Sequence, residues 1–382
     1  MRVLLLTWDY PPARGGIQIW MFELARRLPD AHVTVLAPAA GDAAFDSQSG
    51  LHIRRLRGAM LGPVPWLLHL TVATTWECLT ARPDLIVCGH VLTAPAALLA
   101  RRVFGIPYVV FTYAYEIRRH RRRHIVSRLL RGAEIVIACS HFTRAAVLSH
   151  GVAPQRVSLL YPGVDPERFS AQPDGSGTCR DGTIPTMLSV ARLTEPYKGH
   201  DTVIRALPLI KAKCPGARYV IAGGGRLRDY LAQVARSVGV EDDVVFAGEV
   251  PDDELARLYR SCDVLVQLSR ESASGGGAEG FGIVCLEAAA CGKPVVAGRS
   301  GGLVDAVVDG ETGILVDPVD TEATVAAILS VLQNPSLAGR LGAAGRHRVL
   351  QRFTWEAMAT EARRLFAQAA GQPWARSAAS SS

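Results

Sequence analysis

Short apolar runs rich in Val, Ile and Leu alternate along this chain with longer amphipathic segments, and this alternation constrains the fold more than any other feature. In the first half, six runs predict buried strands at residues 2–7, 32–37, 85–88, 108–112, 135–138 and 157–160. Amphipathic patterns between them predict helices at 18–28, 94–104 and 118–131. The second half predicts strands at 186–190, 218–222, 244–247, 264–268, 294–297 and 313–316, and helices at, for example, 200–213 and 226–238. This order predicts parallel sheets with helices on both faces, the α/β class.

The chain divides into two halves near residues 171–184. Its 382 residues suggest two domains, since a domain has about 150 residues. The polar run Ala-Gln-Pro-Asp-Gly-Ser-Gly-Thr at the division is a linker candidate. We expect two doubly wound, Rossmann-like domains, residues 1–172 and 183–354, with the ligand in a cleft between them. The tail from Gly371 is expected to be disordered.

Composition narrows the class of protein without fixing its partner. Hydrophobic residues make up 49% and charged residues 20%, which excludes a disordered chain. The net charge of +7 suits phosphate, nucleic acid or lipid headgroups equally. Eight scattered cysteines without metal or redox spacing indicate reduced thiols. Neither a signal peptide nor an apolar run of about 20 residues is found, so we expect a cytoplasmic protein, with a peripheral membrane role left open.

Two candidate phosphate sites follow the first strand of each half. The diglycine Gly15-Gly16 opens a predicted helix, where bare backbone and unpaired N–H groups can hold an anion. In the second half come Arg192 and, six positions on, Lys198, two cations that can neutralise a diphosphate. Taken alone, the first site is also compatible with an ordinary loop and the second with two surface cations.

The most informative pattern is Glu279-Gly280-Phe281-Gly282-Ile283-Val284-Cys285-Leu286-Glu287, preceded by Ser274-Gly275-Gly276-Gly277. It predicts a glycine-rich loop leading into a helix that begins near Gly282. Loop amides and the helix N-terminus can hold phosphate, and carboxylates accept hydrogen bonds from vicinal hydroxyls. We therefore expect Glu279 to reach sugar hydroxyls and Glu287 a ribose. The alternative, a loop with an incidental solvent-facing glutamate, is disfavoured because Gly292-Lys293-Pro294-Val295-Val296 follows in the same stretch.

A basic segment spans Arg118 to Arg131, with Ile125, Val126, Leu129 and Leu130 interleaved among its cations. The spacing predicts a basic amphipathic helix, a type that lies on anionic membranes. A solvated face above one buried stripe is an equally good interpretation.

Together these residues resemble the retaining glycosyltransferases of family 4, which have the GT-B fold, and most of all the actinobacterial phosphatidylinositol mannosyltransferases that use GDP-mannose. The resemblance extends to about residue 366. It includes the Pro-Pro…Gly-Gly-Ile-Gln loop, Tyr161-Pro162-Gly163-Val164-Asp165 with Phe169, the Arg192…Lys198-Gly199 pair, the two glutamates, and Ala344-Gly345-Arg346.

The resemblance implies a role for each matched residue. Gly16, beside Gly15, offers its N–H to the donor phosphates, and Arg192 and Lys198 bind the diphosphate. Glu279 orients the transferred sugar, Glu287 binds the nucleotide ribose, and Gly280 to Val284 line the pocket. It further implies an acceptor-binding N-terminal domain, a donor-binding C-terminal domain, and a C-terminal helix, residues 355–367, that packs back on the first domain.

One stretch departs from the family. Many relatives carry His-Gly-His-Glu after the strand ending near Thr112, with one histidine touching the sugar, whereas this chain reads Thr112-Tyr113-Ala114-Tyr115-Glu116. Tyr113 can still donate a hydrogen bond through its hydroxyl, but it cannot perform histidine's acid–base work near neutral pH. The departure leaves the sugar and the acceptor open.

The implied activity is transfer of a hexose, mannose favoured, from a nucleotide diphosphate sugar to a lipid-linked or glycan acceptor, with retention through an oxocarbenium-like ion pair. The chain has no Asp-x-Asp triplet, so neither a metal nor another cofactor is expected. A nucleic acid partner is not expected either.

Parts of the sequence also suggest three other functions. A dinucleotide-dependent oxidoreductase is disfavoured because Ala222-Gly223-Gly224-Gly225 lacks the Gly-x-Gly-x-x-Gly spacing. A nucleotide-sugar-binding protein without activity and a transferase using a UDP-sugar on a small soluble acceptor stay as alternatives. A lipid acceptor would use the basic segment and the apolar, proline-broken stretch 61–70, which a soluble acceptor would leave solvated.

Overall fold

The computed structural model describes residues 1–39, 43–57, 62–118, 123–171, 184–272 and 277–374. The chain forms two compact units. One holds Met1–Gly163 and the segment that begins at Trp355, and the other holds Val164–Thr354. Nearly all of the linker expected at 171–184, and the end of the tail expected to be disordered, lie outside the described residues.

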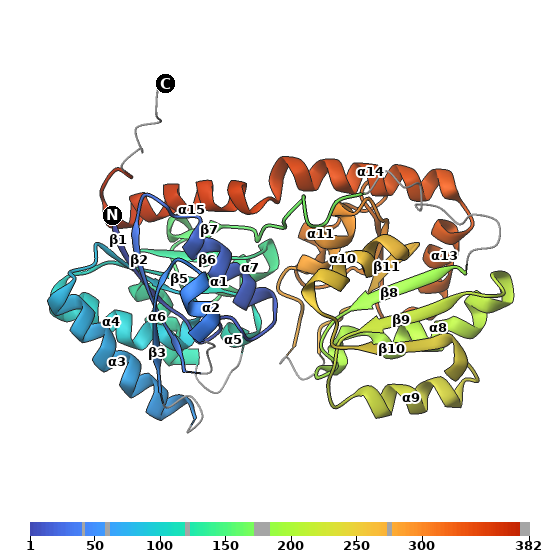
Figure 1. Ribbon diagram of the computed structural model, residues 1–382, viewed down its shortest axis with the longest axis horizontal. Coiled ribbons are helices and arrows are strands. Elements are labelled where there is room, and N and C mark those ends of the chain that lie inside the picture. The colour runs from blue at the N-terminus through green and yellow to red at the C-terminus, as the bar shows by residue number, and fades with distance from the viewer. Residues whose placement is uncertain (40–42, 58–61, 119–122, 172–183, 273–276, 375–382) are drawn as a thin grey trace. The chain divides into compact units, whose positions relative to one another are not determined.

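The first unit is built on a seven-stranded sheet whose neighbouring strands all run parallel, in the order β3-β2-β1-β4-β5-β6-β7 (Figure 1). The order changes direction between β1 and β4, where the chain crosses from one side of the sheet to the other. The strands are β1 (Arg2–Leu6), β2 (His32–Pro38), β3 (His52–Leu56), β4 (Leu85–Cys88), β5 (Tyr108–Thr112), β6 (Ile135–Ala138) and β7 (Val157–Leu159).

The helices of this unit connect successive strands. They are α1 (Gly16–Arg26), α2 (Ala43–Gln48), α3 (Pro63–Thr80), α4 (Ala94–Phe104), α5 (Tyr115–Arg118), α6 (Arg123–Gly132) and α7 (His141–Leu148), with short 3-10 helices at Val91–Thr93 and Pro154–Arg156. None of the helices in the described parts of the whole chain is both long and apolar enough to cross a bilayer.

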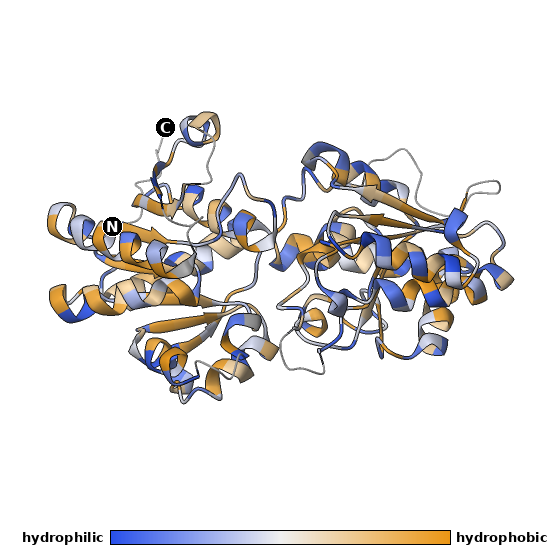
Figure 2. Cartoon of the chain, turned by 90° about the horizontal axis from the view of Figure 1, so that it is seen from below, coloured by the Kyte–Doolittle hydropathy of each residue, from blue (hydrophilic) through white to orange (hydrophobic). Residues whose placement is uncertain are grey.

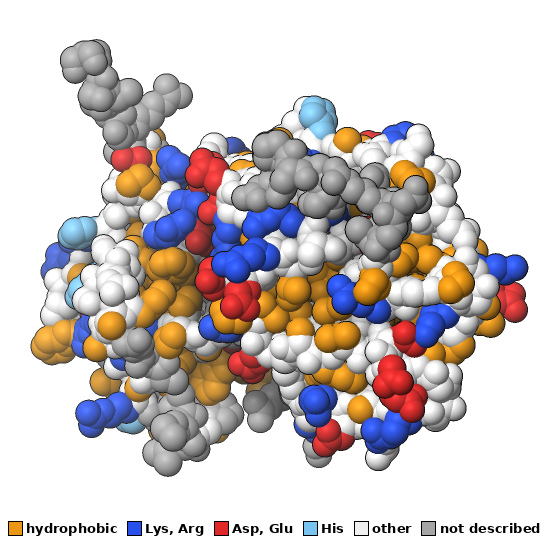
Figure 3. All heavy atoms as spheres, turned by 45° about the vertical axis from the view of Figure 1, so that its right-hand side comes forward, with side chains coloured by type: hydrophobic (Ala, Val, Ile, Leu, Met, Phe, Trp, Pro, Cys, Tyr) orange, Lys and Arg blue, Asp and Glu red, His pale blue; other side chains and the backbone are white. Residues whose placement is uncertain are grey.

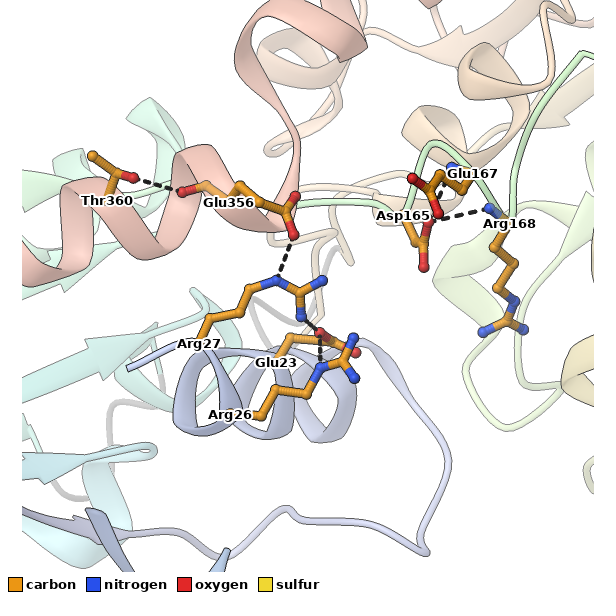
Figure 4. Close-up of polar contacts among 8 residues, drawn as sticks. All are labelled: Glu23, Arg26, Arg27, Asp165, Glu167, Arg168, Glu356 and Thr360. Atoms are coloured by element: carbon orange, nitrogen blue, oxygen red, sulfur yellow. Dashed lines mark hydrogen bonds and ion pairs between the residues drawn. The ribbon is translucent and has the colours of Figure 1, made fainter. Parts of the chain in front are cut away.

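The last helix, α15 (Trp355–Ala370), lies beside α1, β4 and β5 of this unit, as Figure 1 shows. Its inner face, which includes Trp355, Met358 and Phe366, is buried. At its start, Arg27 Nε donates to Glu356 Oε1 over 2.8 Å, and the same guanidinium contacts Glu23 (Figure 4). Apolar burial therefore holds α15 in place, and one ion-pair network fixes its first turn.

The second unit contains a six-stranded parallel sheet in the order β10-β9-β8-β11-β12-β13. Its strands are β8 (Thr186–Val190), β9 (Arg218–Ala222), β10 (Val244–Gly248), β11 (Val264–Gln267), β12 (Val295–Gly298) and β13 (Ile314–Val316). Its helices are α8 (His200–Lys213), α9 (Arg228–Ser237), α10 (Asp252–Ser261), α11 (Ile283–Ala290), α12 (Leu303–Ala306), α13 (Thr321–Leu332) and α14 (Pro335–Arg352), with 3-10 turns at Pro196–Lys198 and Glu241–Asp243.

The central strands of both sheets are buried on both faces, which explains their continuous apolar sequences. Every residue of β4, β5, β6, β11 and β12 is buried. Figure 2 shows the strands of both units in the colours of apolar residues. The predicted fold class, two Rossmann-like α/β domains, is confirmed, and so are the predicted strands, whose ends differ by at most one residue.

The basic segment does not form one described helix. The predicted range 118–131 contains the end of α5 and most of α6, and residues 119–122 lie outside the described part of the chain. The stretch expected to be broken by prolines instead begins α3, where Pro63 and Pro65 occupy the first turn. Proline is tolerated there because the first N–H groups of a helix have no partner inside it.

Candidate active site

A loop leading into α11 carries the central residues of the candidate site. After β11 the structure describes the chain to Ser272 and again from Gly277. The chain then enters α11 at Ile283, and Gly282 is the N-cap of this helix, at φ 94°. The predicted helix start near Gly282 is confirmed. Ser274, Gly275 and Gly276 lie outside the described residues.

Glu279 is paired with Lys198 inside this site. The ammonium Nζ lies 2.7 Å from Glu279 Oε2, and the two side chains are 17% and 16% exposed. Ser269 donates to the same oxygen over 3.0 Å, and Gln267 Nε2 donates to Ser269 Oγ. The carboxylate is therefore held in one orientation by a cation and a hydroxyl.

Electrostatics favour the charged form of both partners. Burial alone would raise the pKa of Glu279, but the charge of Lys198 and the hydrogen bonds from its neighbours outweigh burial and hold that pKa below its usual value. Burial likewise opposes the charge on Lys198, but the Glu279 carboxylate raises the pKa of the ammonium. At neutral pH the site thus contains a cation and a carboxylate acceptor.

Close backbone contacts place these two side chains. Gly199, at φ 77°, directly follows Lys198, and a Cβ there would lie 2.1 Å from the Leu268 carbonyl oxygen. Gly302 donates its N–H to the Glu279 carbonyl over 2.8 Å, and a Cβ at Gly302 would lie 1.9 Å from the Gly280 carbonyl oxygen. Only glycine allows these approaches, so the glycines fix the loops on which Lys198 and Glu279 lie.

Glu287 lies on α11 and is held by a different partner. The Tyr259 hydroxyl, on α10, donates to Glu287 Oε2 over 2.6 Å. The ring of Phe169 packs edge-on against Tyr259 with centroids 5.7 Å apart, so a residue of the Tyr161-to-Phe169 motif supports this contact. At the C-terminal end of α11, Arg346 donates to the Ala290 carbonyl, so a cation caps the helix there.

Arg192 follows β8 and lies close to Lys198. Its charge acts to lower the pKa of the Lys198 ammonium, but the opposite effect of the Glu279 carboxylate is larger. Arg192 is exposed, and within the described parts of the chain its guanidinium has no hydrogen-bond or ion-pair partner. The structure thus places Arg192, Lys198 and Glu279 near one another. The charges of Lys198, Glu279 and Glu287 all act on the thiol of Cys285, whose pKa is raised chiefly by burial.

Gly15 and Gly16 lie in the other unit, at the start of α1. Gly15 has φ 152°, a backbone conformation that residues with a side chain rarely adopt, so this turn also favours glycine. Gln18 Nε2 donates to Asp9 Oδ1 over 2.9 Å. The roles of Gly15 and Gly16 toward the donor stay predictions.

Sequence reasoning missed the residues that hold the glutamates. Ser269 and Tyr259 are single polar residues at a strand end and on a helix, and no local spacing distinguishes them. It also missed His90, after β4, and Glu116, whose pKa is raised to about 7 by burial. The His90 imidazole and the Tyr113 ring lie 6.4 Å apart, centroid to centroid.

The comparisons with known proteins agree with this geometry. Residues 14–168 match the sequence model of Glycosyltransferase Family 4, and residues 179–348 match that of Glycosyl transferases group 1. The chain therefore belongs to glycosyltransferase family 4, and its two parallel-sheet domains are those of the GT-B fold.

The chain is 35% identical, over 98% of its length and 100% of the relative's, to the GDP-mannose-dependent alpha-(1-6)-phosphatidylinositol monomannoside mannosyltransferase of Mycolicibacterium smegmatis. It is 30% identical to the glycogen synthase of Mycobacterium tuberculosis, over 96% and 94% of the two chains. The solved sucrose-phosphate synthase of Thermosynechococcus elongatus superposes with a TM-score of 0.82 at 25% identity, covering 96% and 98% of the two chains.

Proposed function

We propose that this protein transfers a mannosyl group from GDP-mannose to a phosphatidylinositol-based glycolipid, with retention of anomeric configuration. The partly buried Lys198–Glu279 pair carries the proposal, since it offers a carboxylate to sugar hydroxyls next to a cation for the diphosphate. The substrates follow from the relative that is 35% identical over nearly the whole chain. The comparisons do not favour a soluble aglycone acceptor or a binding protein without activity.

In the proposed mechanism, the C1–O bond to the diphosphate breaks and the acceptor oxygen bonds to C1 on the same face. The acceptor's proton passes to the leaving diphosphate, so no protein nucleophile is required. Glu279 is poorly suited to attack C1, because its Oε2 already accepts from both Lys198 and Ser269. Glu279 orients the sugar, and Glu287 holds the ribose.

Arg192, Lys198 and the amides at the start of α11, from Gly280 to Val284, would neutralise the diphosphate. Gly15 and Gly16 would add backbone N–H groups. We propose that this charge makes a metal unnecessary. Among the described residues, no cluster of three or more His, Cys, Asp or Glu side chains is arranged to hold a metal ion.

A lipid acceptor requires contact with a membrane, and three neighbouring helices suit one. On α3, the exposed residues Val64, Leu68, Val72, Trp76 and Leu79 recur every three or four positions, each 57–69% exposed. Helix α4, which contacts α3 and α6, exposes Leu99, Arg102 and Val103. Helix α6 exposes Arg123, His124, Ile125, Arg128 and Arg131.

The only acid on α3, α4 and α6 is Glu77, which is buried and paired with Arg54. The exposed side chains of these helices therefore combine apolar groups and cations, as a surface for an anionic membrane requires. On the face of the molecule drawn in Figure 3, hydrophobic side chains lie beside both basic and acidic ones. We propose that α3, α4 and α6 form the membrane-facing surface of the protein.

The donor assignment predicts thermal stabilisation by a guanine nucleotide. At about 100 times its dissociation constant, GDP or GDP-mannose should stabilise the protein by about 2.7 kcal/mol, with and without EDTA. Differential scanning fluorimetry with GDP, UDP, ADP and their sugars measures this. A shift with UDP species alone contradicts the guanine assignment, and a shift abolished by EDTA contradicts metal independence.

The membrane assignment predicts co-sedimentation with vesicles of phosphatidylglycerol and phosphatidylcholine. Replacing Arg123, Arg128 and Arg131 together by Glu should lower the partition coefficient at least about 10-fold, since each cation near the surface contributes about 1 kcal/mol. The matched control replaces the exposed Arg228, Arg236 and Arg340 of the second unit by Glu. Equal losses in both triple variants, or no binding at low salt, contradict the assignment.

A further inference from the structure

A buried amide ends a strand of the second unit that is otherwise apolar. Gln267 is the last of the four residues of β11, all of which are buried, and it is only 1% exposed. Within the ranges that the structure describes, its Oε1 has no hydrogen-bond partner. An acceptor buried in this way lowers stability, so an apolar side chain of similar length would suit the strand better. The amide must therefore be explained by the contact that its NH₂ group makes.

The amide donates to a serine, and the serine donates to the carboxylate of the candidate site. Gln267 Nε2 lies 3.0 Å from Ser269 Oγ, and this oxygen lies 3.0 Å from Glu279 Oε2. Because the ionised carboxylate can only accept, it takes the single hydroxyl proton of Ser269. The lone pairs of the serine oxygen then need a donor, which the NH₂ group of Gln267 supplies. The hydrogen bonds thus run in one direction, toward the charge.

Backbone contacts fix the position of this serine. Ser269 is fully buried, and a Cβ on Gly298, at the end of β12, would lie 2.5 Å from its carbonyl oxygen. The next residue, Arg270, donates its N–H to the Tyr197 carbonyl over 2.8 Å, and its guanidinium pairs with Asp201 at the start of α8. The hydroxyl of Ser269 is therefore carried on a rigid frame, and it can determine where the oxygen that it contacts lies.

Both fixed donors act on the same oxygen of Glu279. Lys198 Nζ and Ser269 Oγ lie 2.7 and 3.0 Å from Oε2, which leaves most of the accepting capacity of Oε1 for a sugar hydroxyl. In the proposed mechanism Lys198 would also neutralise the diphosphate, so its ammonium would be shared between two anions once the donor is bound. The hydroxyl proton of Ser269 has one acceptor only. The serine would therefore keep the carboxylate in place in the donor complex.

We infer that Gln267 and Ser269 are positioning residues for the hexose, which hold Glu279 so that its Oε1 accepts from a sugar hydroxyl and the site prefers the nucleotide sugar to the free nucleotide. The inference rests on the proposed function, in which Glu279 contacts the sugar. Neither positioning residue needs to touch the sugar, and no proton is transferred by them, so the balance of the reaction is unchanged.

Opposite effects on stability and on binding distinguish this role of Gln267 from a structural one. Gln267→Met removes the NH₂ donor together with the unpartnered acceptor, so we expect a melting temperature equal to that of the wild type or higher. Its Kd for GDP-mannose should nevertheless rise about fivefold, with the Kd for GDP unchanged, because the carboxylate is held less well. Calorimetry of both ligands and scanning fluorimetry measure these quantities.

Ser269→Ala removes the direct contact and should have the larger effect. Its Kd for GDP-mannose should rise about 10-fold and its kcat for mannosyl transfer should fall about 10-fold, with the Kd for GDP unchanged. The double variant Gln267→Met/Ser269→Ala should lose no more than Ser269→Ala alone, because the amide acts through the serine. The matched control is Ser330→Ala on α13, where the hydroxyl donates to the Ala327 carbonyl over 2.8 Å.

The ratio of the two Kd values decides the outcome. The inference is overturned if this ratio stays at its wild-type value in both single variants, or if GDP and GDP-mannose bind more weakly by the same factor. It is also overturned if Gln267→Met melts at a lower temperature with an unchanged ratio, since the amide is then structural. A wild type that binds uridine nucleotides alone contradicts the guanine donor of the proposed function instead, and the same ratio is then measured with UDP and UDP-glucose.

Discussion

Glu279→Gln is expected to lower kcat for mannosyl transfer by about 10²–10³-fold while the protein stays folded. The amide has the same size as the carboxylate, but it loses the charge that orients sugar hydroxyls, and hydrogen bonds to charged groups contribute about 1.5–3 kcal/mol each. Transfer of radiolabelled mannose to lipid, measured at saturating donor, tests this. Glu311→Gln, an exposed glutamate of the same unit, is the matched control.

The partner variant Lys198→Met should lose donor binding and also change how stability depends on pH. In the wild type the depressed pKa of Glu279 stabilises the fold at neutral pH, and this contribution disappears as pH falls through that pKa. In Lys198→Met, burial acts on Glu279 without the opposing cation and raises its pKa. The folded variant then binds more protons than the unfolded chain, so it gains stability as pH falls from 7 to 5.

Urea unfolding at pH 7 and pH 5 measures this gain, because the contribution of Glu279 to the stability of the wild type stays constant above the usual carboxyl pKa. Breaking a buried ion pair from one side costs about 3–5 kcal/mol, and the double variant Lys198→Met/Glu279→Gln should recover part of that loss and lose the pH dependence. A Lys198→Met variant whose stability changes between pH 7 and pH 5 by no more than that of the wild type would show that the two groups are not coupled in solution.

The fold was predictable because the central strands of both sheets are buried on both faces and are therefore continuous apolar runs. Two elements of the first unit that were not predicted, β3 and α3, break that rule. β3 contains Arg54 and Arg55, and it lies at the edge of the sheet, where these arginines pair with Glu77 and Asp46. α3 is apolar on its exposed side as well as its buried side, so its sequence lacks the periodicity that identifies a surface helix.

The site was predictable where residues cluster along the sequence. Glu279, Gly282 and Glu287 lie within nine positions, and the structure confirms the loop and helix on which they lie. The partners Ser269, Tyr259 and Gln267 approach through tertiary packing, for which a single sequence contains no signal. Tyr113 shows a further limit of prediction from sequence. Its hydroxyl was expected to be able to donate to a sugar, but in the structure it donates to the Gly89 carbonyl.

Glu287→Ala is expected to weaken GDP binding by about 10²-fold, because a carboxylate that accepts two ribose hydroxyls contributes roughly twice the strength of one charged hydrogen bond. Tyr259→Phe should weaken it only about fivefold, since it removes the hydroxyl that orients Glu287 through the 2.6 Å contact and leaves the carboxylate in place. Isothermal titration calorimetry of GDP against each variant measures both losses.

Comparing GDP with a nucleotide that lacks the ribose hydroxyls tests the contact of Glu287 with the ribose alone. Wild-type protein should bind 2′,3′-dideoxy-GDP about 10²-fold more weakly than GDP, whereas Glu287→Ala should bind the two nucleotides with nearly equal affinity, because the acceptor of those hydroxyls is already absent. If Glu287→Ala still prefers GDP by the wild-type factor, another group holds the ribose. The Tyr259–Glu287 contact would then serve to fix α10 against α11, and loss of either partner should lower the melting temperature without changing the preference for GDP.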